Sequence, residues 1–295
     1  MKLIRDIHAS HPAGGRPVIS FEFSPPRTAE GDKTLFEKTL PELAKLKPDY
    51  CSVTYGAGGT THDKTLEIVD RIQREHQLTA MSHLTCVGST RAEIAAVLDE
   101  AAARGIRNIL ALRRDPPGGV GEFEKTEGGF EFSSELVAFI KARNQFSIGA
   151  ACFPEGHMHC TAGKFVDWDH LKRKIDAGAD FIITQLFFDN ADFFEFHDHM
   201  TKNLGVTIPI CPGILPLPSA GWIKRFIPLC GAKVPKSVAE KLDEFGEDEN
   251  AVVDWGIDYA TKQCEELLKF GVPGIHFYTV NKVRPTRAIM NNLGL

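Results

Sequence analysis

Short apolar runs alternate with amphipathic stretches along the whole chain, and this alternation limits the possible folds more than any other feature. Eight runs rich in β-branched or aromatic residues have the length of buried strands: 18–24, 50–55, 79–86, 108–113, 147–153, 181–188, 208–215 and 275–280. Apolar residues recur with helical spacing between them, at 63–76, 90–103, 133–144, 167–178, 190–203 and 249–269. The pattern predicts an α/β protein with eight strands and helices between them.

Eight strands joined by helices can form an open doubly wound sheet or a closed (β/α)8 barrel. A chemically useful residue ends almost every predicted strand: Glu22, Thr54, His83, Asp115, Glu155, Gln185, Pro216 and Asn281. In a barrel all of these ends meet at one mouth, which favours the barrel. The long interval 217–274, interrupted by Pro228 and Pro235, predicts extra helices before the last strand. We expect residues 1–295 to form a single catalytic TIM-barrel domain.

Composition and charge exclude several classes of protein. The 295 residues carry 34 Lys and Arg against 39 Asp and Glu, a formal charge of −5, whereas nucleic-acid binding favours a basic face. No apolar run approaches the roughly 20 residues that cross a bilayer, and residues 1–15 lack the apolar core of a signal peptide. The seven cysteines are scattered without a CxxC pair, which indicates free thiols in a reducing compartment. We expect a cytoplasmic enzyme that binds neither nucleic acid nor membranes.

Glu22 lies inside the first predicted strand with a phenylalanine on each side. A carboxylate in such a place loses water, and desolvation favours its protonated form, which is the form that a general acid needs. The alternative is a structural glutamate that pairs with an Arg or Lys across the barrel. Charged groups are rarely placed in mid-strand without a function, so the first interpretation is favoured.

Two loops at strand ends carry weaker signals. Asp115 follows the fourth strand directly before a Pro-Pro-Gly-Gly run, where aspartate is common for the geometry of the turn alone. Arg113 and Arg114 stand beside it and can neutralise it. The run 56–59 (Gly-Ala-Gly-Gly) partly matches a dinucleotide-binding turn, but Thr61 stands where the third glycine would be. A flexible loop at the barrel mouth is the better interpretation of this run.

Two polar clusters have ordinary structural explanations. His157 and His159 alternate as metal ligands on a strand would, but their segment has the character of a loop beyond the fifth strand. The basic run 172–174 (Lys-Arg-Lys) lies in a predicted helix, where a solvated face is the usual explanation. Neither cluster predicts a site by itself.

Several of these segments together resemble the methylenetetrahydrofolate reductase family. The matching strings occur in family order and cover about residues 18–292. They are 21–28 (FEFSPPRT), 52–57 (SVTYGA), 83–86 (HLTC), 171–179 (LKRKIDAGA), 183–189 (ITQLFFD), 212–216 (PGILP) and 276–281 (HFYTVN). Their joint order makes the resemblance specific. It is a resemblance to the bacterial-type catalytic barrel and does not include the regulatory domain of the eukaryotic enzymes.

The resemblance implies a (β/α)8 flavoenzyme of one-carbon metabolism that feeds methionine synthesis. Members of the family bind FAD non-covalently, and NADH or NADPH passes a hydride to the flavin and leaves. Methylenetetrahydrofolate then takes its place and is reduced to methyltetrahydrofolate, which is a ping-pong alternation. The sequence does not choose between NADH and NADPH, and it leaves open whether the chain forms a homo-oligomer.

The family's site residues carry over to matching positions of this chain. The resemblance implies that Glu22 is the general acid that protonates folate N10, in agreement with the desolvation argument. It implies that Asp115 contacts the pterin and tunes the flavin through its charge. Further substrate contacts fall on Gln185, Phe226 and Lys282. FAD contacts fall on Thr54, His83, Arg113, Asp115, Phe153, His157, Asp167, Arg173 and Lys174. The basic run thereby gains a diphosphate partner, and no metal is implied.

Four features depart from the family pattern. Arg114 replaces a usual glycine beside the flavin, and Phe153 replaces a tyrosine, which removes a hydroxyl hydrogen bond worth about 1 kcal/mol. The loop 157–160 (His-Met-His-Cys) differs from the usual His-Pro-Glu-Ala. Lys282 replaces an arginine, so a bidentate grip on the folate carboxylate would weaken, with Arg284 as a substitute. The acid, the aspartate and the glutamine named above are all retained.

Two other functions stay open. A metal-dependent barrel hydrolase or lyase would use His157, His159 and Asp115 and would hold zinc or a similar ion but no flavin. A non-catalytic folate- or flavin-binding module, or one subunit of a larger redox complex, would bind a cofactor that NADH and NADPH cannot reduce. A metal enzyme would give Glu22 and Gln185 no function at the mouth of the barrel, so the flavoenzyme is favoured.

Overall fold

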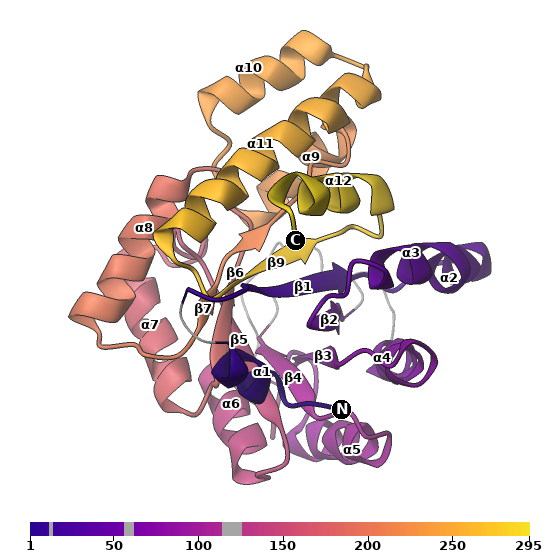
Figure 1. Cartoon of the computed structure of the whole chain (residues 1–295). Helices are drawn as coiled ribbons and strands as arrows, with labels where there is room; N and C mark the ends of the chain where they lie inside the picture. The colour runs from indigo at the N-terminus through magenta and orange to yellow at the C-terminus, as the bar shows by residue number, and fades with distance from the viewer. Residues whose placement is uncertain (12–13, 56–61, 114–125) are drawn as a thin grey trace.

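The computed structural model describes residues 1–11, 14–55, 62–113 and 126–295, and its strands form one parallel sheet (Figure 1). The strands are β1 (Val18–Phe23), β2 (Tyr50–Val53), β3 (Ala80–Thr85), β4 (Asn108–Leu112), β5 (Ser147–Cys152), β6 (Phe181–Thr184), β7 (Ile210–Cys211), β8 (Gly213–Ile214) and β9 (Gly274–Tyr278). They pair in the order β7-β6-β5-β4-β3-β2-β1-β9-β8.

The short strands β7 and β8 complete the barrel as two halves of one interrupted strand. β7 pairs with β6, β8 pairs with β9, and Pro212 lies between the two halves. Proline has no backbone N–H to donate to a strand ladder, but its carbonyl accepts a hydrogen bond from His276 N at 2.9 Å. With β7 and β8 taken as one strand, the sheet has the eight strands that the alternation predicts. The (β/α)8 barrel is confirmed.

Helices lie around the outside of the strands (Figure 1). One helix follows each of the strands β2 to β6, in the order α4 (His62–His76), α5 (Arg91–Ala103), α6 (Ser133–Ala142), α7 (Lys164–Asp176) and α8 (Asn190–Asp198). β1 leads into α2 (Ala29–Thr34), the π-helical turn η1 (Leu35–Thr39) and α3 (Leu40–Ala44), while a second π-helical turn, η2 (His199–Asn203), extends α8. α12 (Val283–Leu293) follows β9. None of the described helices has the length and apolar character of a membrane span.

Three extra helices precede the last strand, as predicted: α9 (Ala220–Cys230), α10 (Lys236–Phe245) and α11 (Glu249–Phe270). Pro235 is the N-cap residue of α10, so the break expected there is present. The break expected at Pro228 is wrong, because α9 runs through this residue and ends at Gly231 with φ 71°. A proline near the end of a helix gives up one backbone hydrogen bond, and the left-handed glycine supplies the actual stop.

The N-terminal helix α1 (Ile4–Ser10) closes the end of the barrel where the strands begin. Ile4 N donates to Asn108 Oδ1 at 2.8 Å, and Arg5 N donates to Ser147 Oγ at 3.0 Å. The apolar side chains of α1 join a buried cluster inside the barrel with Val18, Tyr50, Met81, Leu110, Phe181, Ile183 and Cys211. This end of the barrel is therefore filled by side chains.

Candidate active site

A cavity of about 930 Å³ lies at the carboxyl ends of the strands, which is the end where barrels of this type carry out their chemistry. Residues at the ends of β1, β3, β4, β5, β6 and β9 line it together with residues of helix α7. Its volume is at the upper end of the range for small-molecule and cofactor sites. Three of the eight predicted strand-end residues line this pocket: Glu22, His83 and Gln185. Thr54, Glu155, Pro216 and Asn281 are not among the lining residues, and Asp115 lies outside the described residues.

Glu22 lines this cavity between two histidines. Its side chain is 14% exposed, and its Oε2 lies 3.4 Å from His83 Nε2 and 3.4 Å from His276 Nε2. The Ser20 hydroxyl lies 2.7 Å from His276 Nδ1. The register of β1 and β9 explains this arrangement, because Ser20 pairs with His276 and residues two apart on a strand share a face. Among the described residues, Glu22 thus meets imidazoles and not the Arg or Lys of the structural alternative.

His83 is a neutral, buried neighbour of Glu22. Burial lowers the pKa of His83 to about 4, against the opposing attraction of the Glu22 carboxylate. Its Nε2 makes no hydrogen bond within the part of the chain that the structure describes. A buried polar atom without a partner is unfavourable, so this nitrogen is suited to a hydrogen bond with a ligand in the cavity.

Hydrogen bonds fix the loops on either side of Glu22 to each other. Thr279 Oγ1 donates to Glu22 O at 2.6 Å. The Asn281 side chain accepts from Ser24 N at 3.0 Å and donates to Ser24 O at 2.8 Å, extending the link between β1 and β9 beyond the sheet. Val280 and Asn281 have φ values of 47° and 56°, a left-handed conformation that strains a β-branched residue. Val280 lines the cavity, so this strained turn is part of its wall.

Three cationic side chains line one part of the cavity, the first directly after β4 and the other two on α7: Arg113, Arg173 and Lys174. Lys174 Nζ donates to Ala151 O at 2.8 Å, and burial lowers the pKa of this ammonium group. A phosphate in the cavity would replace the hydration that this group has lost, and guanidinium groups match phosphate oxygens in geometry. This wall is therefore suited to a diphosphate.

The loop after β5 is held against helix α7. Asp167 Oδ2 accepts a hydrogen bond from His157 N at 3.1 Å, and Trp168 Nε1 donates to Phe153 O at 3.0 Å. The rings of Phe153 and His157 meet edge to face with centroids 4.5 Å apart. Gln185, which follows β6, is fixed through its backbone N, which donates to Cys152 O at 2.7 Å. Phe153, His157, Asp167 and Gln185 all line the cavity.

The structure brings most of the predicted site residues to this cavity. The predicted residues that line it are Glu22, His83, Arg113, Phe153, His157, Asp167, Arg173, Lys174 and Gln185. Thr54 and Lys282 do not line it among the described residues: Thr54 N donates to Phe23 O at 2.9 Å, and Lys282 is the exposed N-cap residue of α12. Arg114 and Asp115 lie outside the described residues, as does the side chain of Phe226, whose backbone belongs to α9.

Other residues belong to the site although the sequence did not single them out. Tyr278 lines the cavity and donates a hydrogen bond to Thr184 O at 2.5 Å, and burial raises the pKa of its phenol well above the ordinary value. His276 and Tyr278 stand two apart on β9, opposite Ser20 and Glu22. The alternation of side chains along this strand therefore places both on the face that Glu22 occupies, and this could have identified them. Trp222 and Cys230 of α9 also line the cavity, and no periodicity predicts that this extra helix reaches it.

The metal site of the hydrolase alternative is not favoured. The rings of His157 and His159 lie 5.5 Å apart, and His157 Nδ1 accepts a hydrogen bond from His159 N at 3.2 Å. Asp115 lies outside the described residues. Within the described part of the chain, one group of side chains lies close enough together to hold a metal ion: Cys160, Asp167 and His170. This group includes neither His157 nor His159.

Comparison with known proteins identifies the family. Residues 7–294 match the family model for methylenetetrahydrofolate reductase. The chain is 38% identical over 291 residues to methylenetetrahydrofolate reductase (NADH) 1 of Zea mays, covering 95% of this chain and 49% of that protein. It is 36% identical over 281 residues to 5,10-methylenetetrahydrofolate reductase of Escherichia coli (strain K12), covering 95% of this chain and 92% of that protein. The chain spans about half the length of the plant and Schizosaccharomyces pombe relatives that it matches.

Solved structures support the same fold. An uncharacterized protein from Clostridium thermocellum, which binds two copies of 5-methyl-5,6,7,8-tetrahydrofolic acid, has a TM-score of 0.67 at 17% identity and covers 98% of both chains. A dihydropteroate synthase from Xanthomonas albilineans has a TM-score of 0.51 at 14% identity, covering 95% of this chain and 92% of that one. At these identities the likeness concerns the fold alone. The sequence matches decide the family: this chain belongs to the methylenetetrahydrofolate reductase family.

Proposed function

We propose that this protein reduces methylenetetrahydrofolate to methyltetrahydrofolate with NADH or NADPH through non-covalently bound FAD. The observation that carries the proposal is the shared cavity, in which the Glu22 carboxyl stands between two imidazoles and three cations line another part of the wall. An acid and a diphosphate-binding surface in one pocket meet the needs of a flavin-dependent folate reduction. The names of the relatives agree with the reaction, and those of the plant relatives include NADH.

The residues present fit a flavin dinucleotide. Its diphosphate would bind Arg113, Arg173 and Lys174, of which the buried Lys174 gains most from an anionic partner. The buried His83 Nε2, which has no hydrogen-bond partner among the described residues, would gain one from the cofactor. We assign the other FAD contacts to Thr54, Asp115, Phe153, His157 and Asp167. Such a cofactor, when bound here, would supply hydride transfer from the nicotinamide to the folate.

Glu22 supplies the proton of the reaction. With only 14% of its side chain exposed, the carboxyl group is largely shielded from bulk water and donates its proton to folate N10, so that the five-membered ring opens. His83 beside it is neutral near pH 7, because its pKa is about 4. The Ser20 hydroxyl at His276 Nδ1 holds that ring with its Nε2 towards Glu22.

The remaining substrate contacts are assigned by family position. Gln185 lines the cavity, and we assign it to the pterin together with Asp115, which tunes the flavin through its charge. Phe226 would cover the nicotinamide and folate rings, and Lys282 would meet the folate carboxylate. We further propose a cytoplasmic location and a role in supplying methionine synthesis, the location being supported by seven free cysteines.

Replacement of Glu22 by glutamine tests the proposal, because it removes the proton and preserves the shape. Glu22→Gln should lower methylenetetrahydrofolate reduction by at least about 100-fold and leave NAD(P)H oxidation with a quinone acceptor nearly unchanged. Glu155→Gln is the matched control, since Glu155 follows β5 but is not among the residues that line the cavity. An equal loss of both reactions in Glu22→Gln would contradict the general-acid role.

A further inference from the structure

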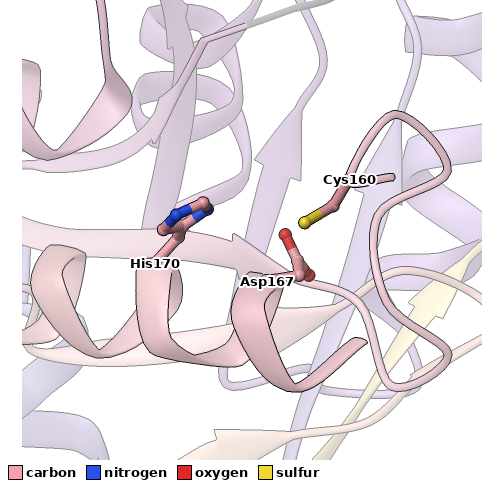
Figure 2. A group of neighbouring side chains, drawn as sticks. All are labelled: Cys160, Asp167 and His170. Atoms are coloured by element: carbon pink, nitrogen blue, oxygen red, sulfur yellow. The ribbon is translucent and has the colours of Figure 1, made fainter. Parts of the chain in front are cut away.

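Three side chains capable of binding a metal lie together on the α7 wall of the cavity. Cys160, Asp167 and His170 each offer one ligand atom, and these atoms all lie within 4.8 Å of one another (Figure 2). All three residues line the cavity, so an ion can enter from it. Figure 2 shows Asp167 and His170 on the same side of α7, with the Cys160 sulfur directed towards the Asp167 carboxylate. We propose that these residues form a site for a divalent ion of the zinc class.

Local structure brings the three ligands together. Asp167 and His170 are three residues apart on α7, which places them on one face of the helix. Cys160 is held over that face by two successive turns of the loop before α7. Cys160 N donates to His157 O at 2.8 Å, and Gly163 N donates to Cys160 O at 3.0 Å. Gly163 is the N-cap residue with φ 96°, a conformation that suits glycine. The backbone therefore positions the thiol without a metal.

The Asp167 carboxylate is oriented by the same loop. Its Oδ2 accepts the hydrogen bond from His157 N at 3.1 Å. A carboxylate has two oxygens and about four lone-pair sites, so this bond leaves capacity for an ion. Hydrogen bonds of this kind to a ligand are common in metal sites and raise their affinity.

Cys160 is one of two cysteines that an ion can readily reach. Five of the seven are buried: Cys51, Cys86, Cys152, Cys211 and Cys264. Burial raises the pKa of each of these five thiols, whereas a metal binds the thiolate. Cys160 and Cys230 are partly exposed, and Cys160 alone of these two belongs to the group with a carboxylate and an imidazole.

The donor set selects the class of ion. Sulfur, nitrogen and oxygen ligands with an open fourth position are typical of zinc, with Zn–S about 2.3 Å and Zn–N about 2.0–2.1 Å. Magnesium and calcium prefer oxygen ligands throughout. A tetrahedral zinc ion holds its donors roughly 3.3–3.7 Å apart, so ligand atoms that lie within 4.8 Å of one another have to close by at most about 1.5 Å. His170 is exposed and can turn to do so. The fourth position is left to a water or a ligand atom from the cavity.

The site has a consequence that rests on the proposed function. Asp167 is also one of the residues that we assign to FAD, so the ion and the flavin would compete for this carboxylate. Occupation by zinc would then exclude the cofactor and keep the enzyme inactive. The metal site itself does not depend on this assignment.

Zinc stoichiometry tests the site directly. The full-length protein, as purified and after removal of any flavin, is dialysed against micromolar zinc and assayed by mass spectrometry and zinc-edge X-ray absorption. We expect one zinc per flavin-free chain with one sulfur neighbour at about 2.3 Å. Less than about one tenth of an ion per chain, or an ion without a sulfur neighbour, would overturn the site.

Matched variants locate the ion. Cys160→Ser and His170→Gln should each weaken zinc binding by at least about 100-fold. Cys230→Ser and His159→Gln should bind as the unmodified protein does, because they change a cysteine and a histidine that line the same cavity outside the group. If Cys230→Ser and His159→Gln weaken zinc binding as much as Cys160→Ser and His170→Gln do, the assignment of the ligands is overturned. His170 is exposed, so His170→Gln keeps the test decisive even if Cys160→Ser fails to fold.

Flavin release tests the consequence. Zinc added to the flavin-loaded protein should release flavin, seen as a rise in flavin fluorescence, and should not do so in His170→Gln. Zinc that binds without releasing flavin would overturn the mutual exclusion. If the protein never retains flavin, the proposed function fails, whereas the zinc stoichiometry still decides the metal site.

Discussion

Replacement of Gln185 tests whether the proposed folate contact can be separated from the handling of the nicotinamide. The Gln185 backbone N donates to Cys152 O, and this bond remains when the side chain is truncated, although the bond that Leu186 N donates to Gln185 Oε1 at 2.8 Å is lost. Gln185→Ala removes a proposed hydrogen bond to the pterin and should raise the folate KM by about 10-fold, as expected for a loss of about 1.4 kcal/mol. NAD(P)H oxidation with a quinone acceptor should change little. Steady-state kinetics of both reactions checks this, and an unchanged folate KM would refute the pterin contact.

The sequence singles out Glu22, which lines the cavity, but not the histidine beside it. The apolar strand around Glu22 marks this carboxylate, although Phe21 and Phe23 themselves pack into the core on the other face of the strand. Nothing local marks His276, which meets Glu22 at 3.4 Å from a strand 254 residues away. That contact depends on the register between β1 and β9, and a single sequence does not specify which strands pair. Thr54 was assigned to FAD by family position, yet its neighbour Tyr55 lines the cavity.

At the scale of the elements, Gly213 lets β8 fit between β6 and β9. A Cβ at Gly213 would lie 2.4 Å from Thr184 O and 2.6 Å from the Tyr278 ring, and the Tyr278 hydroxyl is itself bonded to that carbonyl. Gly213→Ala should therefore lower the free energy of unfolding by roughly 1–3 kcal/mol. Gly221→Ala in α9 is the control: its Cβ would meet no described atom within 4 Å, and it should raise stability by about 0.5–1 kcal/mol. Urea unfolding that shows the same effect for both variants would contradict this account.

The elements were predictable where one physical signal dominated. The apolar runs correctly predict all eight strand positions, and the amphipathic periodicity correctly predicts helices α4 to α8 and α11. The split of the seventh run into β7 and β8 was not predicted, because Pro212 interrupts the ladder from within an apolar run. Helices α2 and α3 were missed as well. They are short, and a π-helical turn that shifts the helical period joins them.

At the scale of the whole molecule, His8 makes the stability of the barrel depend on pH. Its ring is 7% exposed and lies 5.7 Å from the Phe181 ring centroid. Burial lowers the pKa of His8 to about 4, below the value of about 6.5 in an unfolded chain. The unfolded state therefore binds the proton more tightly, and the stability present above about pH 6.5 is lost as the pH falls towards 4.

Replacement of His8 tests this coupling. Between about pH 7.5 and pH 5 the buried ring should remove roughly 2 kcal/mol from the free energy of unfolding. His8→Gln should lose less stability over the same interval, because the replaced side chain does not titrate. His83, whose pKa is also about 4, is present in both proteins, so its contribution cancels in the difference. Urea unfolding at both pH values with identical losses would show that His8 is not responsible.

We propose that one cavity serves the nicotinamide, the flavin and the folate in turn. An anaerobic visible spectrum of the purified full-length protein, recorded after successive additions of NADH, NADPH and methylenetetrahydrofolate, tests it most directly. We expect a flavin band that bleaches with a reduced nicotinamide and returns with the folate. In Glu22→Gln the band should bleach without returning. A protein that stays colourless after FAD is added, or a flavin band that neither nucleotide bleaches, would contradict it.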